Sequence, residues 1–153
     1  GVKNYEGAIV TRGLHRTRDL AGLANETDPV LTNRSWRMAV ISNLSKAVRT
    51  LHLAGFVHND LKWRNILVEM EVDSEKERPW VYLIDCPMGR VLWGPLLRRG
   101  IVKDLACLDK VAKQTLSKTD RLRFYLAYSG KERLDYYDRV RLGKIERFFT
   151  SRN

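Results

Sequence analysis

The segment His58-Asn59-Asp60-Leu61-Lys62-Trp63-Arg64-Asn65, together with Leu83-Ile84-Asp85 downstream, carries the most informative pattern in this chain. Its spaced residues follow His-x-Asp-x-Lys-x-x-Asn, which a chance sequence matches at about one start position in 10⁵. Asp and Asn also form ordinary polar turns, so a turn between a helix and a hairpin is the structural alternative. The residue types and their intervals favour a chemical role over a turn.

Phosphoryl transfer from a nucleotide requires a carboxylate, a cation and oxygen ligands for Mg²⁺, and this segment supplies all three. Asp60 is the candidate base that orients the attacking hydroxyl, and Lys62 can reach the γ-phosphate. Asn65 and Asp85 are the candidate metal ligands. His58 is either an anchor for the loop backbone or a catalytic residue, and we favour the anchor.

The flanking sequence predicts a helix before this segment and a β-hairpin after it. Over residues 34–54 apolar side chains recur at intervals of three and four, and Gly55 follows as a helix terminator. Residues 66–68 and 80–84 are β-forming runs separated by a charged connection. A hairpin brings Asn65 and Asp85 together, because they flank the same end of the two strands.

The remaining sequence is mostly helical in pattern. Residues 8–11 are expected to form a short strand, and Thr17 is expected to cap a helix over residues 18–24. Residues 86–100 contain several Gly and Pro residues, which predicts an irregular loop. Further helices are expected at residues 103–116, 117–130 and 132–149. The sequence therefore predicts an α+β fold that is mostly α.

The composition indicates one soluble globular domain with an anionic partner. The chain has 153 residues, of which 44% are hydrophobic and 30% are charged, and its formal net charge is +10. No apolar run is long enough to cross a bilayer. Cys86 and Cys107 have no metal-site spacing and are expected to be reduced thiols. Lys and Arg are spread over all the predicted helices, so nucleic acid is the less favoured anion.

The segment 58–65 and Asp85 resemble the protein-kinase-like superfamily. Residues 102–108 (Val-Lys-Asp-Leu-Ala-Cys-Leu) and 117–128 (Ser-Lys-Thr-Asp-Arg-Leu-Arg-Phe-Tyr-Leu-Ala-Tyr) are similar to the C-terminal helices of the bacterial lipopolysaccharide kinase family, which includes heptose and Kdo kinases. The resemblance covers most of residues 8–130. It implies ATP as donor, Mg²⁺ as cofactor, and a sugar hydroxyl of lipopolysaccharide or a related glycolipid as acceptor.

The same resemblance gives Asp104 the role of a buried brace for the catalytic loop, with a surface helix cap as the alternative. Asp85-Cys86-Pro87 replaces the Asp-Phe-Gly of protein kinases. No Ser, Thr or Tyr occurs between residues 86 and 103, which excludes regulation by phosphorylation of that loop. We expect this loop to bind phosphates or carboxylates of the acceptor, with ordinary solvated charge as the alternative, through Arg90, Arg98 and Arg99.

The kinase resemblance also predicts which residues belong to the small lobe and which to the large lobe of the fold. No glycine-rich G-x-G-x-x-G loop and no Val-Ala-x-Lys strand occur in the sequence. Residues 1–16 resemble the end of the small lobe and the hinge, where Thr11, Gly13 and Leu14 would touch adenine, and residues 17–153 resemble the large lobe as a single domain. Without a small lobe, we expect this chain alone to bind ATP weakly and turn over little.

Two alternatives to a glycolipid kinase stay open on the sequence. One is an enzyme that phosphorylates protein Ser/Thr or a small molecule, and the other is a non-catalytic kinase-like scaffold or basic binding module. The last segment, residues 131–153, is aromatic and basic, so it either lies on an anionic membrane or packs as a core helix. We expect a cytoplasmic protein that works at the inner face of the bacterial inner membrane.

Overall fold

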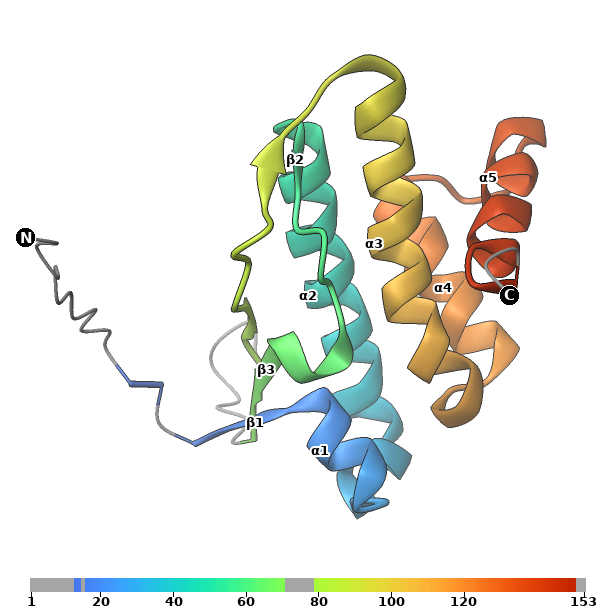
Figure 1. Cartoon of the computed structure of the whole chain (residues 1–153). Helices are drawn as coiled ribbons and strands as arrows, with labels where there is room; N and C mark the ends of the chain where they lie inside the picture. Colours follow the sequence, from blue (N-terminus) through green and yellow to red (C-terminus); the bar gives the residue numbers. More distant parts are fainter. Residues whose placement is uncertain (1–12, 15, 71–78, 151–153) are drawn as a thin grey trace, which may run out of the picture.

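The computed structural model describes residues 13–14, 16–70 and 79–150. Its elements are mostly helices, with short strands on one side of them (Figure 1). The prediction of an α+β fold that is mostly α is therefore confirmed. The strand expected at residues 8–11, which includes Thr11, lies outside the described residues.

The predicted hairpin supplies the central strand and one edge strand of a three-stranded antiparallel sheet. Strand β3 (Ile66–Glu69) pairs with β4 (Val81–Leu83), and Ile66 lies opposite Leu83. Strand β1 (Thr17–Asp19) pairs with the other edge of β3. The predicted start of the helix over residues 18–24, with Thr17 as its cap, is therefore wrong, because residues 17–19 form a strand.

Helix α1 (Leu20–Asn25) begins after β1, and its N-cap is Asp19. The Asp19 carboxylate accepts a hydrogen bond from the backbone N–H of Gly22 at 2.7 Å. Asp is the stronger cap, and pairing with β3 keeps the residues before it extended. A turn of 3₁₀-helix, η1 (Pro29–Thr32), then leads to the long helix.

Helix α2 (Arg34–Leu53) confirms the long helix that periodicity predicts. Its N-cap is Asn33, and Gly55 follows its end with a φ of +74°, in the left-handed region that favours glycine. A side chain at Gly55 would also meet the carbonyl oxygen of Leu92, because a Cβ there would lie 3.2 Å from it. The chain then enters strand β2 (Phe56–Val57), which pairs with β5 (Arg90–Val91).

The loop expected at residues 86–100 is wrong over most of its length. It contains β5, and helix α3 (Gly94–Thr115) begins nine residues before the predicted helix at 103. Pro95 lies in the first turn of α3, where its missing N–H breaks no helical bond. Gly100 is needed inside the helix, because a Cβ there would lie 2.7 Å from a Val57 methyl group. Arg98 and Arg99 consequently lie on a helix and not on a loop.

Helices α4 (Lys118–Ser129) and α5 (Tyr136–Arg147) follow. Ser117 caps α4 as expected, and Gly130 ends it with a φ of +69°. Helix α5 is shorter than the predicted 132–149, because Asp135 and Asp138 form a capping box that sets its start. No helix in the described part of the chain is both long and apolar enough to cross a membrane.

The core lies where α2 packs on α4, α3 packs on α5, and the loop before β3 closes one end (Figure 1). Burial of each of these apolar side chains stabilises the folded state by about 1.5–3 kcal/mol. The buried side chains that form it include Leu23, Trp36, Val48, Leu61, Ile66, Val68, Leu105, Leu108, Tyr125 and Ile145.

Candidate active site

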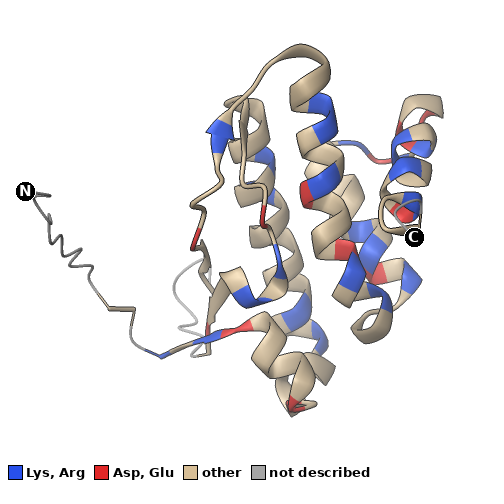
Figure 2. Cartoon of the chain, in the orientation of Figure 1, with Lys and Arg blue, Asp and Glu red and all other residues tan. Residues whose placement is uncertain are grey.

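The loop formed by residues 58–65 is anchored through alternate side chains. Leu61 and Trp63 are buried, and the Trp63 indole N–H donates to the carbonyl of Leu108 on α3 at 2.9 Å. Between them, Asp60, Lys62 and Arg64 keep contact with solvent, with the two cations the more exposed. The apolar residues therefore fix the loop to the core, while the charged residues line a groove. Figure 2 shows acidic and basic positions next to each other along this loop.

Asp104, on α3, holds the start of this loop. Its carboxylate is fully buried and accepts hydrogen bonds from the backbone N–H groups of His58 at 2.7 Å and Asn59 at 2.8 Å. The same carboxylate lies 3.3 Å from Nε2 of His52 on α2. This position, in the middle of α3 and shielded from solvent, is not that of a surface helix cap. It suits a brace that fixes the backbone before Asp60.

His52 extends this contact to a third helix. Its Nδ1 lies 2.8 Å from the hydroxyl of Tyr128 on α4, and burial raises the pKa of Tyr128 to about 12. His52 was not predicted from the sequence, because nothing in the local pattern of α2 distinguishes it from the other buried positions of that helix. The start of the loop is thus tied to α2, α3 and α4 at once.

Asp60 lies among cations and one amide. Lys62 Nζ is 2.6 Å from its Oδ1, and the Asn65 amide nitrogen donates to its Oδ2 at 3.2 Å. Arg64 lies 3.6 Å from the same carboxylate. The hydrogen bond from Lys62, helped by these neighbours, holds the pKa of Asp60 below its usual value. Asp60 is therefore a carboxylate at neutral pH, and it can accept a hydrogen bond from a hydroxyl.

The two proposed metal ligands lie at the same end of the hairpin. The backbone N–H of Ile84, next to Asp85, donates to the Asn65 carbonyl at 3.0 Å. The Asn65 amide nitrogen is engaged with Asp60, which leaves the amide oxygen for a cation. Asp85 is exposed, has a φ of +56°, and makes no side-chain bond to any described residue.

These donors fit Mg²⁺ bound together with a nucleotide. In the described ranges, no three His, Cys, Asp or Glu side chains gather as a metal site. Mg²⁺ is commonly held by one or two protein oxygens together with substrate phosphates, so two donors at the hairpin end are enough. His58 supports this end of the site, since its Nε2 lies 3.0 Å from the Ile84 carbonyl.

A groove of about 510 Å³ opens beside Asp60 and is lined by cations. Lys103, Cys107 and Lys110 follow one face of α3 at intervals of four and three, and they form one wall. Lys62 and Arg64 come from the loop, and Asp60 is the only carboxylate among the described lining residues. Phe149 closes one side, with Lys110 Nζ 5.3 Å from its ring centroid.

Several sequence predictions lie away from this groove. Arg90, Arg98 and Arg99 do not line it, and the sequence prediction did not include Lys110, which does. Helical periodicity over residues 103–110 was the signal that could have found Lys110. Binding of the acceptor by the three arginines stays a prediction. Gly13 and Leu14 precede β1, and Leu14 is exposed. Their contact with adenine stays a prediction.

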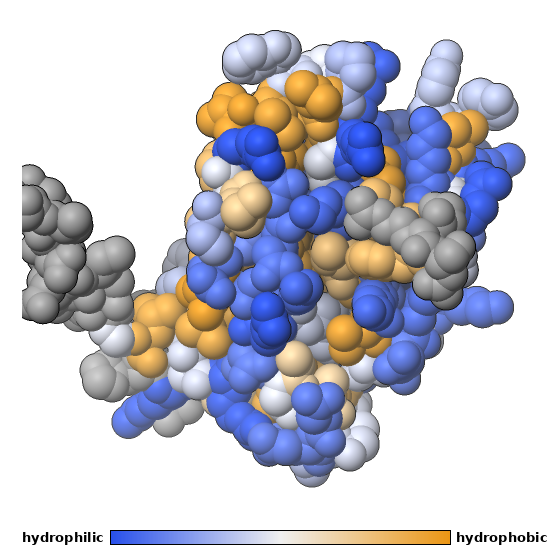
Figure 3. All heavy atoms as spheres, viewed as in Figure 1, coloured by the Kyte–Doolittle hydropathy of each residue, from blue (hydrophilic) through white to orange (hydrophobic). Residues whose placement is uncertain are grey.

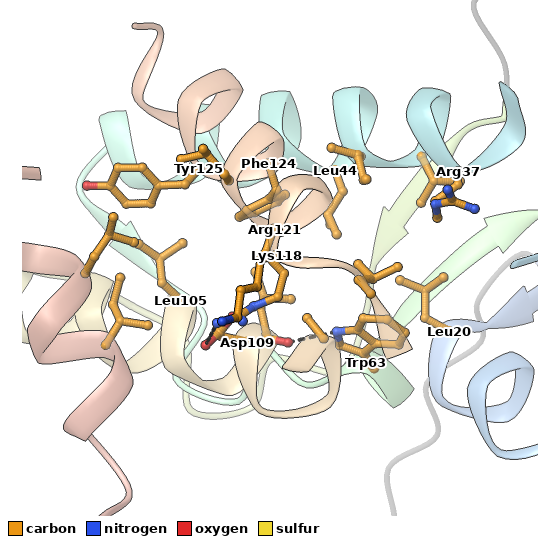
Figure 4. A pocket seen from close by; sticks show the side chains of 18 of the residues that line it. Leu20, Arg37, Leu44, Trp63, Leu105, Asp109, Lys118, Arg121, Phe124 and Tyr125 are labelled. Atoms are coloured by element: carbon orange, nitrogen blue, oxygen red, sulfur yellow. Dashed lines mark hydrogen bonds and ion pairs between the residues drawn. The ribbon is translucent and has the colours of Figure 1, made fainter. Parts of the chain in front are cut away.

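A second, apolar cavity of about 360 Å³ lies between α2, α3, α4 and α5 (Figure 4). Leu44, Leu105, Phe124 and Tyr125 are among its walls, and Arg121 and Asp109 form an ion pair at one side. This space is partly open to solvent and its lining is mostly apolar, features that small-molecule pockets share.

Comparison with known proteins shows which family and which fold the chain resembles. The family model described as the lipopolysaccharide kinase (Kdo/WaaP) family matches residues 1–128. A solved structure described as WaaP in complex with acyl carrier protein is similar with a TM-score of 0.69 at 23% identity, over 91% of this chain and 58% of that chain. At this identity the likeness shows the fold alone. No curated protein matches.

Proposed function

Because this chain belongs to the lipopolysaccharide kinase (Kdo/WaaP) family, we propose that it transfers the γ-phosphoryl group of ATP to a sugar hydroxyl of lipopolysaccharide core or a related glycolipid. The observation that carries this proposal is Asp60, ionised beside Lys62 on a loop held by the buried Asp104. Residues 17–153 would be the large lobe of the kinase-like fold, and residues 1–16 would belong with the hinge.

Each polar residue of the loop has a distinct task in this mechanism. Asp60 accepts the hydrogen bond of the attacking hydroxyl and takes its proton as the hydroxyl oxygen bonds to the γ-phosphorus. The bond from that phosphorus to the β–γ bridging oxygen breaks, and ADP leaves. Lys62 exchanges its contact with Asp60 for the γ-phosphate and offsets the charge that develops there. Asn65 and Asp85 would hold Mg²⁺, which when bound neutralises the nucleotide phosphates. His58 and Asp104 keep the loop in position.

The charge of the groove supports an anionic acceptor. A hydroxyl presented to Asp60 lies within the groove whose walls carry Lys103, Lys110 and Arg64. Among the described residues, neither Lys103 nor Lys110 has an ion-pair partner, and Lys110 lies over the Phe149 ring. Such cations attract phosphate or carboxylate groups on the sugars next to the reacting hydroxyl. A neutral small molecule or an uncharged protein segment would leave them without partners.

The metal role of Asp85 is tested by Asp85→Ala. We expect the Mg²⁺-dependent part of nucleotide affinity to fall at least tenfold, because one of two protein oxygens for the cation is lost. Titration of a fluorescent ATP analogue, with Mg²⁺ and with EDTA, measures this difference. The control is Asp60→Asn, which should bind the Mg²⁺ nucleotide as the wild type does. An unchanged Mg²⁺ dependence in Asp85→Ala would remove Asp85 from the metal site.

We further propose an acyl carrier protein as a partner, supported by the complex in which the similar WaaP structure was solved and by the apolar cavity. An acyl chain delivered by such a protein would fill the space between the α2–α5 helices. We expect an acyl carrier protein with a hexadecanoyl chain to bind at least tenfold tighter than its unacylated form, since each buried methylene contributes about 0.8 kcal/mol. Calorimetric titration of both forms measures this, and equal affinities would exclude the cavity as the acyl site.

A further inference from the structure

Exposed apolar side chains gather at the end of the molecule where α2 ends, β2 pairs with β5, and α3 begins. Figure 3 shows orange side chains collected at this end, with blue ones beside them. Trp93 is 77% exposed and Leu96 is 62% exposed, and apolar side chains exposed together as a patch, unlike single ones, indicate an interaction surface. We call this surface the β5 tip, and its exposed apolar residues are Leu53, Met88, Val91, Trp93 and Leu96.

The β5 tip is a single surface, because backbone bonds join its parts. Val91 lies opposite Phe56 in the β2–β5 pair, and the Leu92 N–H donates to the carbonyl of Gly55 at 2.8 Å. Leu53 ends α2 two residues before Gly55. Trp93 is the N-cap of α3, so Leu96 lies in the first turn beside it. The pairing therefore fixes these apolar groups on one rigid end of the fold.

The charges at the β5 tip are all positive. Arg90, Arg98 and Arg99 are exposed there, and none of them has an ion-pair partner within the described ranges. The two segments that build this end, residues 34–59 and 86–103, contain no Asp or Glu. Apolar groups that include a tryptophan, surrounded by unpaired arginines, match the interface of a bilayer that carries anionic lipids.

We propose that the β5 tip docks on an anionic phospholipid surface, with Trp93 and Leu96 inserted at the headgroup level and the arginines on phosphates. This inference is independent of the proposed function. The tip is connected to the groove through β2, which runs directly into the loop of Asp60, and through the Asn59 amide, which donates to the Met88 carbonyl at 2.9 Å. Docking would hold the groove beside the membrane.

The competing surface is α5, where Tyr136 and Tyr137 are 73% and 76% exposed. Their rings contact each other edge to face, and carboxylates lie close by in Asp135 and Asp138. Lys131 is already paired with both of these carboxylates. Helix α5 also carries exposed cations, Arg139 and Lys144, but it carries carboxylates with them, whereas the segments of the β5 tip contain none. It is therefore the less complementary surface for an anionic membrane, although its aromatic exposure is equal. This makes it the matched control.

Vesicle co-sedimentation of the full-length protein tests the proposal. Wild type should bind vesicles of phosphatidylglycerol and phosphatidylcholine, bind pure phosphatidylcholine at least tenfold more weakly, and lose affinity as salt rises. The double variant Trp93→Ala/Leu96→Ala should bind at least tenfold more weakly than wild type. Changing the three arginines to Ala should weaken binding on the order of 100-fold. The pair Tyr136→Ala/Tyr137→Ala should bind as wild type does.

Tryptophan fluorescence in a Trp80→Phe background adds a direct readout, because Trp36 and Trp63 are buried and leave Trp93 as the exposed reporter in the described part. A blue shift of emission on adding anionic vesicles is expected. Absence of vesicle binding by the wild type, wild-type affinity in Trp93→Ala/Leu96→Ala, or absence of an emission shift in the Trp80→Phe protein would each overturn the proposal. Loss of binding in the tyrosine pair alone would assign the membrane to α5 and overturn it equally.

Discussion

Replacing Asp60 by Asn is expected to lower kcat for phosphoryl transfer by about 10²–10⁴-fold, the range associated with loss of a general base. Asn keeps the shape of the side chain but cannot take the hydroxyl proton. Because Asp60 is partly exposed, and its side-chain hydrogen bonds and ion pairs within the described residues go to the same loop, the fold should be unaffected. Single-turnover transfer of labelled phosphate to a lipopolysaccharide acceptor measures the change in rate.

The matched control for this variant is Asp109→Asn. Asp109 is also a partly buried carboxylate with two cationic partners, Arg121 and Lys113, but it lies outside the groove of Asp60. Its loss should leave kcat within about twofold of wild type. If Asp60→Asn retained wild-type kcat, or if both variants lost activity together, the assignment of Asp60 as base would be wrong.

Replacing Asp104 by Ala is expected to destabilise the protein by about 3–5 kcal/mol, among the largest effects of a single substitution. The change leaves the backbone N–H groups of His58 and Asn59 buried without an acceptor, and it removes the partner of His52. The free energy of unfolding in urea measures this. A loss below about 1 kcal/mol would show that Asp104 does not brace the loop.

A second pair of variants separates bracing from general stability. Asp104→Asn keeps one acceptor oxygen, so it should fold and still lower kcat by distorting the loop. Asp138→Asn changes another buried carboxylate, whose pKa is lowered to about 2 through bonds from Lys131, the Asp135 N–H and Tyr125, far along the chain from the loop. It should lower stability without changing kcat. Equal kcat in the two variants would contradict the positioning role of Asp104.

Local sequence patterns predicted the helices and strands whose formation depends mainly on neighbouring residues. The helix over 34–54 follows from its apolar periodicity and from Gly55, and the hairpin follows from two β-forming runs. The start of α3 could not be predicted this way. Gly94, Pro95 and Gly100 usually break helices, but here Pro95 opens one and Gly100 fits against Val57.

Site residues that lie close together in the sequence could be predicted, but contacts between segments far apart in the sequence could not. The spacing of residues 58–65 pointed to Asp60, Lys62 and Asn65, because these lie within one loop. The contact of His52 with Asp104 joins residues 52 positions apart, and the groove wall on α3 depends on how that helix packs. Likewise, β2 and β5 have two residues each, too few for a periodic signal. Tertiary packing alone sets these contacts.

The most direct test of a glycolipid kinase is the destination of the phosphate. The full-length protein is incubated with γ-labelled ATP, Mg²⁺, lipopolysaccharide from which core phosphates have been removed, and a generic protein substrate. The label should appear on the lipopolysaccharide, depend on Mg²⁺, and be absent when Asp60→Asn replaces the wild type. Label on the protein substrate alone, or equal labelling of lipopolysaccharide by Asp60→Asn, would contradict the proposed activity.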